Sequence, residues 1–181
     1  RHLKNGTTTC VYFATIHREA SLQLARICER IGQRSFIGKV NMDREAPDFY
    51  VESTEESLTE TERFIEEILS MKSPLITPII TPRFVITCTE RLMTGLSQLA
   101  TKYNLPIQSH VSENTGEVQF VKQLFPNEKS YTNVYDTHGL LTDRTIMAHG
   151  IFLTDDEMKL LSDKKSTISH CPLSNFSLKS G

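Results

Sequence analysis

Apolar and polar positions along the chain follow two alternating patterns. Short runs of apolar, β-branched and aromatic residues are typical of buried strands, while apolar residues three or four positions apart are typical of helices. The expected strands cover residues 7–17, 35–42, 75–85, 105–110, 145–150 and 166–172. The expected helices cover residues 18–31, 53–71, 89–103, 114–125 and 154–164. Two of these helices begin with a capping box, Ser53-x-x-Glu56 and Thr154-x-x-Glu157.

This alternation predicts an α/β fold in which helices cover a parallel sheet. An open, doubly wound sheet accommodates the six expected strands, but such folds usually carry a Gly-rich phosphate turn after the first strand, where this chain reads IHREAS. A (β/α)8 barrel requires two more strands. The pattern alone therefore leaves both architectures open, and it shows no internal repeat or domain linker.

Composition narrows the classes of partner. The formal net charge is -2, and basic residues are scattered among acidic ones, so we expect no nucleic-acid partner and no binding to a membrane surface. The four cysteines lie far apart and form no C-x-x-C pair, which favours a reducing, cytoplasmic setting. The chain begins with neither an initiator Met nor a signal-type apolar segment, and we expect it to be a piece of a longer protein.

Candidate chemistry lies where expected strands end, because the loops there vary without disturbing the core. His110 and His149 end neighbouring expected strands, and Glu113 follows the first of them. Neutral imidazole is a common zinc ligand, and a nearby carboxylate can carry a proton. A lone histidine on an apolar strand is more often structural. Glu113 is equally open to three interpretations: a proton carrier, a solvated side chain, and a carboxylate favoured by the dipole of the following helix.

Two further strand ends carry candidate residues. Arg83 is able to hydrogen-bond a carbonyl or ring nitrogen, and Phe84 to stack on a flat substrate; the alternative is a surface salt bridge beside a core Phe. His170 is open as a metal ligand, a donor to a ligand, or a buried structural histidine, and the adjacent Cys171 suits a small core position.

Several of these motifs occur together in one known family. TPRF (81–84), IQSHVSEN (107–114), IMAHG (146–150) and ISHCPLSN (168–175), in this order, resemble the amidohydrolase superfamily, and within it the enzymes that deaminate guanine. The resemblance covers essentially the whole chain. It implies a (β/α)8 TIM barrel, with residues 1–181 forming one partial domain that supplies about strands two to seven and lacks the first and last.

The resemblance also implies a site and a reaction. One zinc ion per subunit is expected, with His110 and His149 matching two of its ligands. The family's His-x-His pair, the purine-binding glutamine downstream of it and the aspartate of the last strand have no counterpart here. Glu113 matches the proton shuttle, and Arg83 with Phe84 matches the pair that recognises guanine. The implied reaction is hydrolysis of free guanine to xanthine and ammonia by a homodimer.

Three expectations complete this interpretation. The chain by itself should be inactive and prone to aggregate, because it would expose two open sheet edges. The first alternative function is an amidohydrolase acting on another heterocycle. The second is a non-catalytic barrel that serves as an interaction domain.

Overall fold

The computed structural model describes residues 1–180, in which strands and helices alternate. The strands are β1 Thr9–Phe13, β2 Arg34–Gly38, β3 Val40–Asn41, β4 Ile76–Pro78, β5 Thr81–Pro82, β6 Ile107–Val111, β7 Thr145–His149 and β8 Thr167–Ser169. The α-helices are α1 Arg18–Arg30, α2 Thr54–Ser70, α3 Glu90–Lys102, α4 Thr115–Leu124, α5 Tyr131–Thr137, α6 Asp155–Asp163 and α7 Pro172–Leu178. Short 3-10 turns are η1 Leu3–Asn5, η2 Asp48–Tyr50 and η3 Val85–Thr87.

Every recorded strand pair is parallel. The pairings give the orders β1-β2-β4, β3-β5 and β6-β7-β8. β3 continues β2 after Lys39, and β5 continues β4 after a short break. A parallel bridge between Ile80 and Ile107 joins this part to β6, and the Gln108 N–H donates to the Ile80 carbonyl at 2.8 Å. The chain is thus an α/β array of parallel strands running from β1 to β8, as predicted, and within residues 1–180 these two outer strands do not pair with each other.

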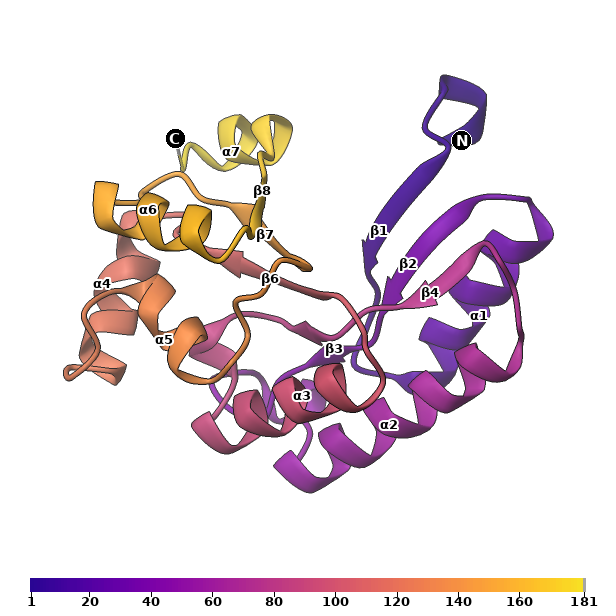
Figure 1. Cartoon of the computed structure of the whole chain (residues 1–181), viewed down its shortest axis with the longest axis horizontal. Helices are drawn as coiled ribbons and strands as arrows, with labels where there is room; N and C mark the ends of the chain where they lie inside the picture. Colours follow the sequence, from indigo (N-terminus) through magenta and orange to yellow (C-terminus); the bar gives the residue numbers. More distant parts are fainter. Residues whose placement is uncertain (181) are drawn as a thin grey trace.

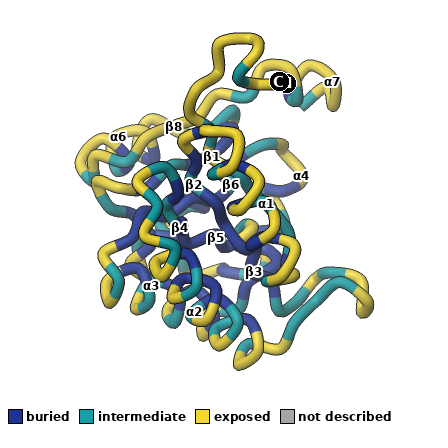
Figure 2. The backbone as a smooth tube through the Cα atoms, turned by 90° about the vertical axis from the view of Figure 1, so that its right-hand side faces the viewer, coloured by how far each residue is buried: buried dark blue, intermediate teal, exposed yellow. Residues whose placement is uncertain are grey.

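The helices α1 to α6 form an outer layer around the strands (Figure 1). The central strands and the inner helix faces are buried, while outward helix faces are exposed (Figure 2). In α3, Leu92 and Leu96 are fully buried in the core, and Leu99 on the same face of the helix is partly buried. Burial of an apolar stripe on each helix is what holds it to the sheet.

The helix starts follow the sequence signals closely. Both predicted capping boxes form, so that Ser53 and Glu56 in α2, and Thr154 and Glu157 in α6, satisfy each other's backbone N–H groups. These reciprocal bonds fix where the chain leaves the strand-end loops and enters the outer layer.

The strand ends differ from the expected ones. The strand expected over 75–85 ends at Pro82, and a 3-10 turn follows it. The strand expected over 166–172 ends at Ser169, because Pro172 starts α7; proline has no N–H to donate and its fixed φ suits the first helical turn. Between two of the expected elements, residues Tyr131–Thr137 form the seven-residue helix α5.

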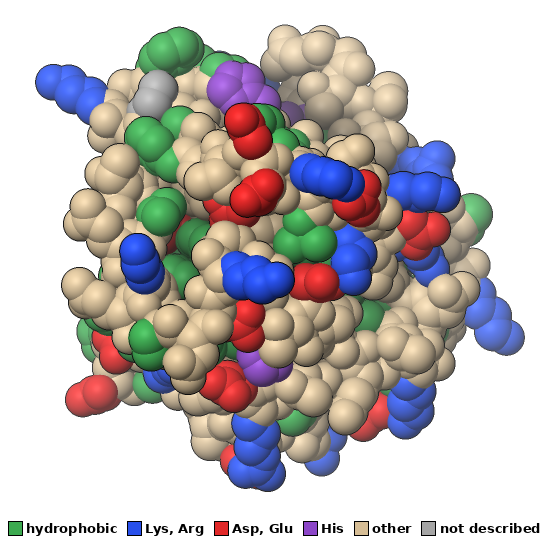
Figure 3. All heavy atoms as spheres, turned by 60° about the vertical axis from the view of Figure 1, so that its left-hand side comes forward, with side chains coloured by type: hydrophobic (Ala, Val, Ile, Leu, Met, Phe, Trp, Pro, Cys, Tyr) green, Lys and Arg blue, Asp and Glu red, His purple; other side chains and the backbone are tan. Residues whose placement is uncertain are grey.

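The surface carries mixed charge. On the face shown in Figure 3, acidic and basic side chains are interspersed, and α6 carries the ion pair Lys159–Asp163 at 2.7 Å. Over residues 1–180, no helix has the length and apolar character required to cross a membrane.

The interior at the end of β2 leaves no room for a side chain at Gly38. A Cβ there would overlap the Thr81 hydroxyl and lie 2.6 Å from Gln108 Nε2. We expect Gly38→Ala to lower the free energy of unfolding by about 1–3 kcal/mol, the usual cost of overpacking a filled interior. Urea denaturation followed by circular dichroism measures the change.

The matched control is Gly116→Ala in α4, where a Cβ would contact only Asn114 Oδ1, at 3.3 Å. Alanine favours a helix over glycine, so this variant should lose no stability. Equal unfolding midpoints for the two variants would contradict the close packing at Gly38.

Candidate active site

Two histidines lie side by side where β6 and β7 end. The imidazole centroids of His110 and His149 are 5.5 Å apart, and the ring planes differ by 25°. His110 also contacts the Phe13 ring at the end of β1, with centroids 4.3 Å apart. His149 is only 7% exposed, and His110 is partly buried. The structure therefore brings the two predicted ligands together; their role as ligands stays a prediction.

Their approach depends on an unusual backbone conformation. In the β6–β7 register, His110 pairs with Ala148, and His149 pairs with Val111, whose side chain lies in the core. A regular pleat would put His149 on the same side as Val111. However, His149 has φ 75°, in the left-handed region, so its ring is turned toward His110. Such a conformation costs about 1–3 kcal/mol in a residue other than glycine, and strain of this kind concentrates at functional sites.

Each imidazole is oriented through its Nδ1 atom. His110 Nδ1 lies 2.6 Å from the Arg83 carbonyl oxygen, and His149 Nδ1 lies 2.8 Å from Asn175 Oδ1. Both oxygens only accept, so in each ring Nδ1 donates and Nε2 keeps its lone pair when the ring is neutral. Burial lowers the pKa of His110, which favours this neutral form. Both Nε2 atoms are thus free to bind a metal ion.

Glu113 faces the same place. Its Oε1 lies 3.6 Å from His149 Nε2. The start of α4 is served by other residues, because Asn114 Oδ1 accepts from the Glu117 N–H at 2.8 Å and Glu117 Oε2 accepts from the Glu113 N–H at 3.1 Å. Of the three interpretations of Glu113, this geometry favours the proton carrier.

Arg83 and Phe84 follow β5, next to His110. The Arg83 guanidinium lies 5.2 Å from the centroid of the Phe84 ring, and Arg83 is exposed. In the described part of the chain, Arg83 forms no ion pair with a carboxylate, so the salt-bridge alternative is wrong. Phe84 is partly buried against the core. One guanidinium nitrogen, Nη1, lies 3.9 Å from Met42 Sδ.

In the last motif, ISHCPLSN (168–175), the residue that contacts the candidate site is Asn175, which the sequence analysis did not single out. His170 is exposed, so the interpretation as a buried structural histidine is wrong, and Cys171 is half-exposed rather than a core residue. Asn175 of α7 is 1% exposed and holds His149. A polar residue fully buried on a short helix is a clear signal in the structure, but the sequence shows only a polar asparagine.

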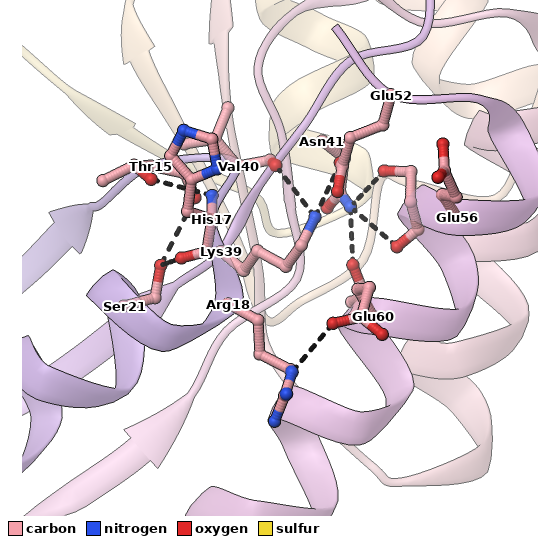
Figure 4. Close-up of polar contacts among 12 residues, drawn as sticks. Thr15, His17, Arg18, Ser21, Lys39, Val40, Asn41, Glu52, Glu56 and Glu60 are labelled. Carbon is pink, nitrogen blue, oxygen red and sulfur yellow. Dashed lines mark hydrogen bonds and ion pairs between the residues drawn. The ribbon is translucent and has the colours of Figure 1, made fainter. Parts of the chain in front are cut away.

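A second polar cluster lies where β1 and β3 end (Figure 4). The Lys39 side chain is fully buried and pairs with Glu52 at 2.7 Å. Burial lowers the pKa of Lys39, and the carboxylate opposes this shift. Arg18 of α1 pairs with Glu60 of α2 at 2.8 Å. The first bond ties the β3–α2 loop to the strands and the second joins the first two helices, so we regard the cluster as structural.

The residues present fit part of a metal site. A catalytic zinc ion usually has three protein ligands and an open position for water. His110 and His149 each use Nδ1 in a hydrogen bond to the protein, which leaves Nε2 as the atom that could bind a metal ion. Among residues 1–180, however, no group of three or more His, Cys, Asp and Glu side chains is placed to hold a metal ion. A complete site needs ligands beyond those described.

Comparisons with known proteins agree on one family. The sequence model of the amidohydrolase family matches residues 1–181. A guanine deaminase from Dictyostelium discoideum is 54% identical over 181 residues, which are 100% of this chain and 40% of that protein. The chain thus spans about 40% of the length of such curated relatives.

The fold of the chain also matches solved structures of deaminases. Guanine deaminase from C. acetobutylicum, with guanine bound in its active site, has a TM-score of 0.96 at 44% identity, over 99% of this chain and 43% of that one. An adenosine deaminase from Xanthomonas campestris with bound zinc has a TM-score of 0.85 at 25% identity, over 99% of this chain and 38% of that one.

The bond between His149 and Asn175 generates a prediction. We expect Asn175→Leu to lower the free energy of unfolding by about 1–3 kcal/mol, because the buried Nδ1–H of His149 loses its acceptor. Asn175→Asp keeps an acceptor and should lose less. Thermal and urea unfolding measure the change, and Ser177→Ala, at an exposed position of the same helix, is the control. If Asn175→Leu were as stable as the control, the bond would not hold His149.

Proposed function

This chain belongs to the amidohydrolase family, and we propose that it is part of a zinc-dependent guanine deaminase that hydrolyses guanine to xanthine and ammonia. The observation that carries the proposal is the group formed by His110, His149 and Glu113 beside Arg83 and Phe84. The guanine bound to the C. acetobutylicum relative supports the choice of substrate.

The proposed architecture is a (β/α)8 barrel. Residues 1–181 would form one partial domain that contributes about strands two to seven, with β2/β3 and β4/β5 each counting as one barrel strand. The parallel array from β1 to β8 and its helical outer layer support this proposal. The first and last barrel strands would come from the rest of the longer protein.

His110 and His149 would supply two zinc ligands through Nε2, and the remaining ligands would lie outside this chain. A bound zinc ion would supply Lewis-acid activation of water. The chain's own contribution is orientation, because the Arg83 carbonyl and Asn175 fix both rings. Such partners of ligating histidines support both the geometry and the basicity of the metal ligands.

Glu113 would move the proton. Water would add its oxygen to the amino-bearing ring carbon while the π pair of the ring C=N bond moves onto the ring nitrogen, and Glu113 would take one proton from that water. The protonated carboxyl would then give this proton to the amino nitrogen, and the C–N bond would break as the ring C=N bond re-forms. Ammonia would leave, and the proton that remains on the added oxygen would move to the ring nitrogen to give xanthine. The Glu113 carboxylate is half-buried, with Oε1 3.6 Å from His149 Nε2, and this contact supports a position next to the proposed metal ion.

Arg83 and Phe84 would select the base. The guanidinium presents several N–H donors in one plane, which suits the carbonyl oxygen and ring nitrogens of a purine. The exposed position of Arg83 over the Phe84 ring leaves these donors available. We further propose that the substrate is the free base, that the longer protein is a homodimer, and that it acts in the cytoplasm, where free cysteines such as Cys28 and Cys88 remain reduced.

The first test is ammonia release from guanine, adenine and cytosine, with zinc supplied. We expect the longer protein to act on guanine. The 181-residue chain by itself should be inactive and bind zinc weakly, because two ligands do not complete the site. Turnover of another base, or of none, would contradict the proposed substrate, and a tightly zinc-loaded, monomeric 181-residue chain would contradict the proposed division of ligands.

A second test concerns recognition of the base. In the longer protein, Arg83→Ala should reduce kcat/KM for guanine by about 10²-fold or more, because bound guanine would lose a charged hydrogen-bond donor. Zinc content should stay at the wild-type level. Arg26→Ala, at an exposed site on α1, is the matched control for loss of a guanidinium. Wild-type kinetics in Arg83→Ala would refute this role.

A further inference from the structure

One tyrosine hydroxyl is buried behind the candidate site, on the side of the outer helices. Tyr135 of α5 has no exposed surface. Its Oη lies 2.6 Å from the His110 carbonyl oxygen, 2.9 Å from Ser109 Oγ and 3.2 Å from the Val85 backbone nitrogen. A single phenol thus reaches both β6 and the turn η3 that follows β5.

The donors and acceptors around this hydroxyl are consistent with one another. The Val85 N–H donates to Tyr135 Oη, and the Tyr135 hydroxyl donates to the His110 carbonyl. The Ser109 hydroxyl donates to the Pro82 carbonyl at 2.8 Å and also touches Tyr135. Burial raises the pKa of Tyr135 above its ordinary value, so the phenol keeps the proton that it donates.

These bonds close a ring of contacts through the site. Tyr135 holds the His110 backbone, and the His110 imidazole binds the Arg83 carbonyl at 2.6 Å. The chain then runs through Phe84 to Val85, whose N–H returns to Tyr135. The two side chains proposed to recognise the base therefore lie on a segment whose two ends are fixed to one histidine and one phenol.

We propose that Tyr135 is a positioning residue that couples Arg83 and Phe84 to His110, so that the base-recognition pair and the metal ligand keep a fixed separation. This inference rests on the proposed function. It concerns the geometry of the site when zinc and guanine are bound, because hydrolysis requires the water and the ring carbon to meet within a narrow range of distances.

The ordinary alternative is a core tyrosine whose hydroxyl has merely found partners. The neighbouring Tyr131 provides a comparison: its ring is stacked on that of Tyr135, with centroids 5.7 Å apart, but its hydroxyl lies 3.4 Å from the His110 carbonyl. Phenylalanine at position 135 would keep the packing and remove only the hydroxyl. The two interpretations therefore differ in what Tyr135→Phe changes.

The experiment compares the wild-type longer protein with its Tyr135→Phe variant. We expect zinc affinity, measured by competition with a chelator, to fall about tenfold, because an outer partner of a metal ligand is lost. We also expect KM for guanine, at saturating zinc, to rise several-fold. Tyr12→Phe is the control, since its hydroxyl bonds Gln33 at 2.8 Å, outside this ring of contacts.

A second variant distinguishes an effect on the metal ligand His110 from an effect on the segment that carries Arg83 and Phe84. Ser109→Ala removes the hydroxyl that lies 2.9 Å from Tyr135 Oη and donates to the Pro82 carbonyl at 2.8 Å, so the Tyr135 hydroxyl loses one partner and the segment that carries Arg83 loses one bond to β6. We expect this variant to raise KM for guanine while its zinc affinity stays at the wild-type value. If Tyr135→Phe does not fold, Ser109→Ala decides, and an unchanged KM overturns the inference.

The outcomes also distinguish the two proposals. A folded Tyr135→Phe protein with wild-type zinc affinity and KM, and only lower thermal stability, would overturn the positioning role. A wild-type protein without guanine turnover would overturn the proposed function. In that case the zinc affinities still test the link from Tyr135 to His110, since they require no substrate.

Discussion

The hydrogen bond from His110 Nδ1 to the Arg83 carbonyl is the interaction on which the candidate site depends. It joins the end of β6 to the segment after β5 at 2.6 Å. Since Nδ1 is used in this bond, Nε2 of the neutral ring keeps its lone pair. The same bond holds the backbone of Arg83, whose side chain is the exposed cation of the site. One contact therefore fixes both the tautomer of the His110 ring and the position of the Arg83 backbone.

The position of His149 requires a strained backbone conformation. The strand register alone would put the His149 side chain on the same side of the sheet as the buried Val111. The left-handed backbone of His149 turns the imidazole ring toward His110 instead. A cost of about 1–3 kcal/mol is comparable to what a charged or buried hydrogen bond contributes. Asn175 supplies such a bond from a distant helix. The short helix α7 thus has a definite role in the site: it stabilises the conformation that the strand disfavours.

The sequence predicted the parts of this arrangement that depend on local patterns. The parallel α/β order, both capping boxes and the gathering of His110, His149 and Glu113 at neighbouring strand ends follow from periodicity and from the rule that parallel strands end at one edge. The turned backbone of His149, the contact of Asn175 and the three bonds of Tyr135 could not be predicted, because each depends on long-range packing. The end of the sixth expected strand was missed for a local reason, since Pro172 was assigned to the strand when it starts a helix.

The charges of the site indicate what kind of molecule it suits. Arg83 contributes one positive charge and Glu113 one negative charge, while burial keeps His110 neutral. The Glu113 carboxylate would repel a phosphate or polyanion, and the single positive charge of Arg83 is too small to offset this repulsion. A neutral heterocycle with a carbonyl group on one side and an amino group on the other suits these charges better. Its carbonyl oxygen would accept from the Arg83 guanidinium, and its amino group would face the Glu113 carboxylate. The opposed charges of Arg83 and Glu113 thus favour a free base over a nucleotide.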